Sequence, residues 1–291
     1  MSDAARLPAY AGFDIRPLHP RFGAEILGLD LSEPLDDASF AEVYRAFLDH
    51  QLLLFRDCEL PQAAQVAFAR GFGEVQVHVM NQYHNAEFPE LYTLSNLGAD
   101  GKPSGRHPDR GTMYWHSDNS WSKVTGQATM LYVEVAPARG GGTEWADMYG
   151  AYELLEPAEK ARLAGMRAVH DLNFSRTRRH GEDPMTEEQR RQKPPVDHPI
   201  VRTHGETGRK CLYLGDHASH ILGLPLDQGR AIVEALNASI VKPEIVYSHA
   251  WRARDFVVWD NRCLLHRAQA YDTGTEPRVI RRCTVLGQVP V

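Results

Sequence analysis

The sequence predicts a mostly β fold, a sandwich or barrel with flanking helices. Short segments rich in β-branched and aromatic residues recur along the chain, and few stretches show the apolar spacing of a helix. The 23 glycines and 18 prolines among 291 residues are close to ordinary globular usage, which excludes a collagen-like or low-complexity chain. A chain of this length can bury a sizeable core. No linker divides it, so we expect a single domain spanning residues 1–291.

Strand-like segments follow one another from the N-terminal part of the chain to its end. They are expected at residues 13–29, 52–55, 113–118, 129–135, 199–203, 211–214, 245–248, 255–259 and 278–286. The run 52–55 is continuously apolar, which is typical of a strand buried on both faces. Many short strands with few helices favour a sandwich or barrel.

Helical stretches flank these strands. Ser39 and Glu42 form a capping box that begins a helix with an apolar stripe. Pro61 opens a second helix, which Gly71 and Gly73 close. Two more helical stretches are expected at residues 147–165 and 225–240.

Two polar stretches are expected to lack regular core elements. Residues 81–112 are rich in Asn, Gly, Pro and charge, and we interpret them as a loop that covers a site. Residues 175–198 are highly polar and are expected to form an exposed insert. Neither stretch has an assigned role at this point.

Charge and cysteine usage narrow the class of partner. The chain has 32 basic and 38 acidic residues, a net charge of −6, and no long basic run, so no nucleic-acid partner is expected. It shows no apolar signal core at its start and no membrane-length apolar stretch, so we expect no membrane partner. None of the four cysteines forms a Cys-x-x-Cys pair, which fits a reduced, cytoplasmic protein.

A His-x-Asp pattern within a strand-like segment suggests a metal site. In a strand, residues i and i+2 point to the same face, so His116 and Asp118 can chelate one ion. The pattern alone is not specific, because His107 and Asp109 repeat it in a charged loop where strand geometry is not expected. A further histidine would complete a two-histidine, one-carboxylate triad, which leaves open positions and suits Fe(II). His266, after the apolar run 255–259, is the candidate, although a surface or capping role fits it equally.

Two arginines and a threonine indicate how small carboxylates would be held. Arg278 and Arg282 share one face of the C-terminal strand, and Arg281 should point to the other face. Guanidinium groups match carboxylates, so the pair binds anions if that face lines a cavity and is merely solvated if it does not. Thr143 follows three glycines that lack the pattern of a phosphate loop, and its hydroxyl can donate to a carboxylate.

Taken together, these motifs resemble the TauD/TfdA family of Fe(II)- and 2-oxoglutarate-dependent dioxygenases. The matching pieces are Trp115 to Asp118, Gly141 to Thr143, Trp259 to Arg262 with His266, and Arg278 to Arg282. The N-terminal segments FGAEILGLDL and LLLFRDCELPQAAQVAFARGFG are similar to the same family, so the resemblance covers nearly the whole chain.

The resemblance implies a double-stranded β-helix, that is, a cupin-like jelly roll, with iron at its mouth. It implies that His116, Asp118 and His266 are the catalytic iron ligands. It also implies that Thr143 and Arg278 bind 2-oxoglutarate, and that O2 is the oxidant. Homo-oligomers, dimers or larger, are a weaker expectation from the same resemblance.

The substrate is less well defined than the reaction. The segments at 194–225 and 257–272 look most like 2,4-dichlorophenoxyacetate dioxygenases, which implies hydroxylation beside an ether oxygen and collapse to a phenol and glyoxylate, with succinate and CO2. Arg282 would meet the carboxylate of this small anionic substrate. His217 and His220 match the same stretch, with structural roles equally open. His78 falls where taurine dioxygenases carry a substrate-contacting histidine.

Two other functions remain open on the sequence alone. A taurine or alkylsulfonate dioxygenase that releases sulfite is suggested by His78 and Arg282. A non-catalytic jelly-roll binding protein is the other class, and the intact set of candidate iron ligands argues against it.

Overall fold

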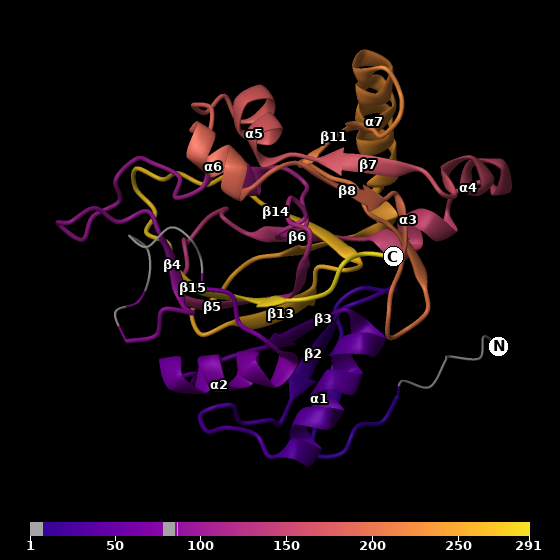
Figure 1. Ribbon diagram of the computed structural model, residues 1–291. Helices are drawn as coiled ribbons and strands as arrows, with labels where there is room; N and C mark the ends of the chain where they lie inside the picture. Colours follow the sequence, from indigo (N-terminus) through magenta and orange to yellow (C-terminus); the bar gives the residue numbers. More distant parts are fainter. Residues whose placement is uncertain (1–7, 78–84, 86) are drawn as a thin grey trace.

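The computed structural model describes residues 8–77, 85 and 87–291 (Figure 1). Its largest element is a seven-stranded sheet with the order β1-β2-β3-β13-β5-β15-β4, in which only the β2–β3 pair is parallel. The strands of this sheet are β1 (Asp14–Pro17), β2 (Ala24–Leu27), β3 (Leu52–Phe55), β4 (Tyr92–Ser95), β5 (Gly126–Val135), β13 (Phe256–Asp260) and β15 (Val279–Leu286).

Smaller antiparallel sheets lie on one side of the large sheet (Figure 1). One is β12-β6-β14, a second is β11-β7-β8, and a two-stranded sheet pairs β10 with β9. Their bounds are β6 (Thr143–Asp147), β7 (Arg167–His170), β8 (Val196–Pro199), β9 (Val201–Thr203), β10 (Lys210–Leu212), β11 (Ala218–Ile221), β12 (Val246–His249) and β14 (Leu264–Ala268).

Two hydrophobic cores hold these layers together. One combines Leu131 and Val257 of the large sheet with Leu265 of the small sheet, so it lies between the sheets. The other packs the opposite face of the large sheet, through Met130, against the helices α1 (Asp37–His50) and α2 (Gln62–Phe72). In Figure 1 both helices cover that face. The prediction of a mostly β jelly roll with flanking helices is confirmed.

The remaining helices surround the smaller sheets. They are α3 (Met148–Glu153), α4 (Pro157–Leu163), α5 (Leu172–Phe174), α6 (Glu187–Gln192) and α7 (Leu226–Ile240), with short turns η2 (Arg110–Met113), η3 (Ser175–Arg179) and η4 (Pro243–Ile245). α7 lies against β11, where a Cβ on Gly229 would approach the Ile221 nitrogen to 2.8 Å. No helix within the described ranges is long and apolar enough to cross a membrane.

The predicted start of the first helix is wrong by a few residues. Asp36, not Ser39, is the N-cap, and its carboxylate accepts the Ser39 backbone N–H at 2.7 Å. Glu42 bonds Arg45 instead of closing a capping box. The second helix starts after Pro61 and ends at Phe72 with Gly73 as its C-cap, as predicted, while Gly71 lies within the last turn, where a Cβ would come within 2.5 Å of the Phe40 ring.

The segment 113–118 is not a strand, contrary to the sequence prediction. It leaves η2, and His116 makes a single antiparallel bridge to His266 before the chain turns at Asp118. The stretch 147–165 forms two helices, α3 and α4. The expected loop 81–112 contains the strand β4, which extends the large sheet beside β15.

Candidate active site

Three buried side chains converge where β14 meets the turn before β5. The backbones of His116 and His266 exchange both hydrogen bonds, at 3.0 and 2.9 Å, which sets the two imidazoles on one side. His116 Nε2 lies 3.6 Å from Asp118 Oδ1, and His266 Nε2 lies 3.7 Å from Asp118 Oδ2. One ligand atom from each of these three residues lies within 4.8 Å of the others. Two imidazoles and a carboxylate at this spacing fit a facial Fe(II) site.

Burial and neighbouring charges set the protonation of these three residues. His116 Nδ1 donates to the Tyr114 carbonyl at 2.7 Å, which turns Nε2 toward the site. Burial alone would lower the pKa of His116, but the neighbouring Asp118 carboxylate raises it, so a metal ion at Nε2 would displace a proton. Burial, together with the neighbouring His116, holds the pKa of His266 well below its usual value, so His266 is neutral. Burial alone would raise the pKa of Asp118, but Arg282 and the two histidines hold it well below its usual value.

A second cluster of potential ligands has a different character. His204, Asp260 and Cys263 also lie close together and are buried. Here the Asp260 carboxylate is already neutralised, because Arg262 Nη2 donates to it at 2.7 Å and His204 Nε2 lies at 3.0 Å. We therefore interpret this cluster as a structural ion-pair network.

Arg278 is a buried cation without a countercharge. Its residue is 4% exposed, and it makes no salt bridge to any carboxylate among the described residues. Its Nε is buried and lacks a hydrogen-bond partner there, and burial lowers the pKa of the guanidinium to about 10. Leaving a buried charge unpaired is costly, so this residue fits the role of an anion receptor.

Thr143 also has a free hydrogen to donate. It is buried at the start of β6, and its Oγ1 accepts the indole N–H of Trp251 at 3.1 Å. A hydroxyl has one donor and two acceptor sites, so the Thr143 hydroxyl hydrogen remains available for a carboxylate oxygen. Both residues expected to bind 2-oxoglutarate, Arg278 and Thr143, therefore have a hydrogen-bond donor available for a carboxylate.

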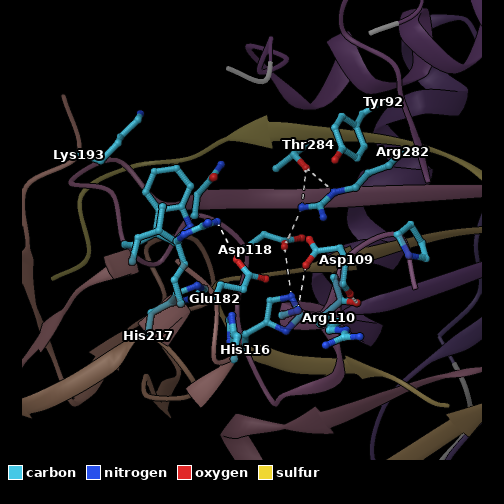
Figure 2. Close-up of a pocket in the computed structure, with 18 of the residues that line it drawn as sticks. Tyr92, Asp109, Arg110, His116, Asp118, Glu182, Lys193, His217, Arg282 and Thr284 are labelled. Carbon is cyan, nitrogen blue, oxygen red and sulfur yellow. Dashed lines mark hydrogen bonds and ion pairs between the residues drawn. The ribbon is translucent and has the colours of Figure 1, made fainter. Parts of the chain in front are cut away.

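Arg282 lies beside the candidate metal ligands. Its Nη2 donates to Asp118 Oδ1 at 2.7 Å, and its guanidinium also reaches the Thr284 hydroxyl at 3.3 and 3.4 Å (Figure 2). Arg281 takes the opposite face of β15, as predicted. It is nevertheless buried, because its guanidinium lies over the Tyr132 ring and donates to the Leu60 carbonyl.

A cavity of about 730 Å³ opens in front of these groups. Arg282, Asp118 and His116 line one part of it, and Figure 2 shows Lys193 and Glu182 across from Arg282. Arg278 lies next to this cavity, since its guanidinium faces the Tyr271 ring, which in turn contacts the cavity residue His107. The cavity therefore has room for a small organic acid beside a metal and a second carboxylate.

The substrate histidines expected from the sequence are placed differently from one another. His217 lines the cavity, its Nδ1 lies 3.1 Å from the Ser120 hydroxyl, and burial lowers its pKa to about 4, so it is neutral at neutral pH. His220, on β11, is not among the residues that line the cavity, and its Nδ1 pairs with the Ser219 hydroxyl at 2.9 Å. A role for it in substrate binding stays a prediction. His78 lies outside the described residues.

The polar stretch 175–198 is not merely an exposed insert. Arg176, His180 and Glu182 line the cavity, as do Met185, Gln189, Gln192 and Lys193. The stretch is fastened to the site because His180 Nε2 lies 2.7 Å from Asp216 Oδ2, and Tyr114 donates to the Arg179 carbonyl at 2.7 Å. The sequence does not reveal this role, because a segment so rich in Arg and Glu is typical of solvent-exposed surface.

Comparison with known proteins assigns the chain to a family. Residues 14–284 match the model of the family described as "Taurine catabolism dioxygenase TauD, TfdA family". The chain belongs to the TauD/TfdA family. As a TauD/TfdA enzyme it is an Fe(II)- and 2-oxoglutarate-dependent dioxygenase that acts on a small molecule.

Relatives of this chain include dioxygenases named for phenoxy acids. The α-ketoglutarate-dependent 2,4-dichlorophenoxyacetate dioxygenase of Cupriavidus pinatubonensis is 38% identical over 283 residues, which cover 94% of this chain and 98% of the relative. The (S)-phenoxypropionate/α-ketoglutarate dioxygenase of Sphingobium herbicidovorans is 33% identical, with 94% and 95% coverage.

A solved structure gives the same assignment. AAD-2 in complex with Mn(II) and N-oxalylglycine has a TM-score of 0.85 and 36% identity, covering 96% of this chain and 98% of AAD-2. Solved taurine dioxygenases are also similar, one from Burkholderia xenovorans at 29% identity and a TM-score of 0.79. The comparisons favour the phenoxy-acid prediction over the taurine alternative.

Proposed function

We propose that this enzyme hydroxylates an aryloxyalkanoate such as 2,4-dichlorophenoxyacetate at the carbon beside the ether oxygen. The observation that carries the proposal is the arrangement around one cavity: a His-Asp-His cluster, Arg282 beside it, and the unpaired Arg278 next to it. The similarity to two classes of phenoxy-acid dioxygenase supports the choice of substrate.

The iron would be held by His116, Asp118 and His266. Fe(II) bound there, with 2-oxoglutarate and O2, supplies the oxidant that hydroxylates a C–H bond while the cosubstrate becomes succinate and CO2. Arg278, which has no other countercharge among the described residues, would pair with the distal carboxylate of 2-oxoglutarate, and Thr143 would donate its hydroxyl hydrogen to the same group.

The organic substrate would be oriented by its own carboxylate. Arg282 lies at the cavity wall with a guanidinium edge next to Asp118, and neutral His217 offers a ring nitrogen from the other side of His116. Holding the carboxylate there would bring the neighbouring ether carbon toward the metal. Its hydroxylation gives a hemiacetal, which loses the aryl oxygen as a phenol and leaves glyoxylate. His78 stays a proposal for the same pocket.

Four broader expectations belong to the same proposal. The enzyme acts as one domain over residues 1–291, as a homo-oligomer, and without nucleic acid, in keeping with a net charge of −6. A cytoplasmic location is supported by four free, buried cysteines. Light scattering on the purified protein tests the oligomer.

A stoichiometric assay tests the proposed reaction. Purified enzyme is supplied with Fe(II), ascorbate and 2-oxoglutarate, and succinate and phenol are measured with phenoxyacetate, 2,4-dichlorophenoxyacetate or taurine. We expect phenol and substrate-stimulated succinate in equal amounts with an aryloxyacetate, and no sulfite from taurine. Sulfite release without phenol release would contradict the substrate class, and no succinate with any acid would contradict the reaction.

A further inference from the structure

The turn between β13 and β14 contains an asparagine, Asn261, whose side chain contacts both the Asp118 backbone and a threonine that bonds the Asp118 carboxylate. Asn261 is fully buried, and its side-chain oxygen accepts the Asp118 backbone N–H at 3.2 Å and the Trp259 indole N–H at 3.1 Å. Its side-chain nitrogen donates to the Thr129 hydroxyl oxygen at 2.9 Å. Thr129, on β5, is also fully buried, and its hydroxyl lies 2.6 Å from Asp118 Oδ2.

The chemistry of these groups decides which atom donates in each hydrogen bond that links Trp259, Asn261, Thr129 and Asp118. An indole and a backbone amide can only donate, so the atom of Asn261 that faces them must be the oxygen. The other end of the amide is then the NH₂ group, which must donate to Thr129. Because a hydroxyl has one hydrogen, and the carboxylate of Asp118 can only accept, Thr129 donates to Oδ2.

We propose that Thr129, oriented by Asn261, is a positioning residue that fixes the Asp118 carboxylate for metal binding. The proposal rests on the proposed function, in which Asp118 is an iron ligand. The Thr129 hydroxyl occupies a lone pair of Oδ2, while Oδ1 faces His116 and Arg282. Hydrogen bonds to both oxygens restrict rotation of this carboxylate about its Cβ–Cγ bond. The fold therefore preorganises the carboxylate for metal binding.

Hydrogen bonds of the neighbouring residues and of its own backbone hold Asn261 in place. Asp260, the residue before it, accepts hydrogen bonds from Arg262, the residue after it, at 2.8 Å to Oδ1 and 2.7 Å to Oδ2. The Asn261 carbonyl accepts the Ser117 hydroxyl at 2.7 Å, and its backbone N–H donates to the Gln127 carbonyl at 2.9 Å. The Asp260–Arg262 pair thus holds the asparagine that orients Thr129.

The glycine at the start of β5 is required for the same arrangement. Gly126 donates its backbone N–H to the Asp118 carbonyl at 3.2 Å. A Cβ there would come within 2.8 Å of that carbonyl oxygen and 3.4 Å of the Asn261 side-chain nitrogen. Only a residue without a side chain therefore allows β5 to lie this close to the Asp118 turn.

Metal affinity of Thr129 variants tests the proposal without reference to turnover. Thr129→Val keeps the shape and removes the donor, Thr129→Ala removes it with a smaller side chain, and Thr129→Ser keeps it. Thr125→Val is the matched control, because Thr125 is a buried threonine whose hydroxyl bonds Gln288 and Arg202 and does not contact Asp118. Mn(II) and Co(II) dissociation constants are measured by chelator competition, with the Co(II) absorption spectrum and the melting temperature of the metal-free protein alongside.

The expected result is a loss of metal affinity of about 10- to 100-fold in Thr129→Val and Thr129→Ala, the range for removing a hydrogen-bond partner of a ligand. Thr129→Ser and Thr125→Val stay near the wild type, and the Co(II) spectrum changes only where the donor is lost. Unchanged affinity in Thr129→Val, or equal losses in Thr129→Ser or Thr125→Val, would overturn the proposal. If the wild type binds neither metal, the proposed function itself fails.

Discussion

At the scale of single residues, the charged side chains of the site differ in whether they have a partner of opposite charge. Asp118 is surrounded by Arg282 and two histidines, whereas Arg278 has no carboxylate at all among the residues that the structure describes. A buried cation is stable only when it is paired, so Arg278 has a strong requirement for an anionic ligand. The alternation of side chains along the C-terminal strand predicted this pair of arginines. It could not show that Arg281 is buried too, because burial depends on the Leu60 segment.

Replacing Arg278 should therefore weaken 2-oxoglutarate binding more than protein stability. Removing one partner of a buried, hydrogen-bonded charge pair costs at least about 2 kcal/mol, or about 30-fold in affinity. In Arg278→Met we expect a rise of that size or more in the dissociation constant of 2-oxoglutarate, measured by calorimetry with Mn(II) present. Arg281→Met, on the opposite face, is the control and should leave this constant unchanged. Equal affinity in both variants and the wild type would contradict the assignment.

At the scale of elements, long apolar segments were predictable and short site-bearing ones were not. The sequence predicts the strands β3, β5, β13 and β15, because each is buried on at least one face and is therefore rich in apolar residues. The aromatic residues of segment 113–118 predict a strand, but the segment makes only a single bridge to β14, between His116 and His266. Thr129 and Asn261 are the residues proposed to orient Asp118. Thr129 comes from β5, and Asn261 comes from the turn between β13 and β14. Their contacts depend on tertiary pairing that no local pattern reveals.

The packing of α1 on α2 allows a prediction in which two effects compete. Ala in place of a helical Gly normally stabilises by up to about 1 kcal/mol. In α2, however, a Cβ on Gly71 would lie 2.5 Å from the Phe40 ring of α1. Overpacking of this kind costs about 1–3 kcal/mol, so Gly71→Ala should lower the free energy of unfolding in urea.

A second variant isolates the cause of that loss. Phe40→Leu shortens the side chain that meets Gly71, so Gly71→Ala should cost less in the Phe40→Leu background than alone. Stabilisation by Gly71→Ala in the wild-type background would show that the helices separate freely and would contradict the packing described here.

At the scale of the whole molecule, burial of histidines makes stability depend on pH. Two buried histidines are neutral at neutral pH: burial holds the pKa of His170 well below its usual value and lowers that of His217, in the cavity wall, to about 4. The unfolded chain binds protons at these residues below about pH 6.5, whereas the folded protein does not. Stability from this source is therefore complete above pH 6.5 and is lost as the pH falls toward 4.

Chemical denaturation across this range measures the effect. For the metal-free protein we expect the free energy of unfolding to fall between pH 7 and pH 4, with His217 alone contributing up to about 3 kcal/mol of the loss. His217→Asn, which does not titrate, should show a shallower decline over the same range. Identical pH profiles for the variant and the wild type would mean that His217 is not buried as a neutral group.

We expect His116, Asp118 and His266 to form a single iron site on which turnover depends. The direct measurement is the Fe(II) or Mn(II) stoichiometry of the wild type and of His116→Ala, Asp118→Ala and His266→Ala, together with 2-oxoglutarate turnover in the same preparations. We predict one metal per chain in the wild type, and loss of both metal binding and succinate formation in each variant that remains folded. A folded His116→Ala or Asp118→Ala variant with full activity would contradict the claim.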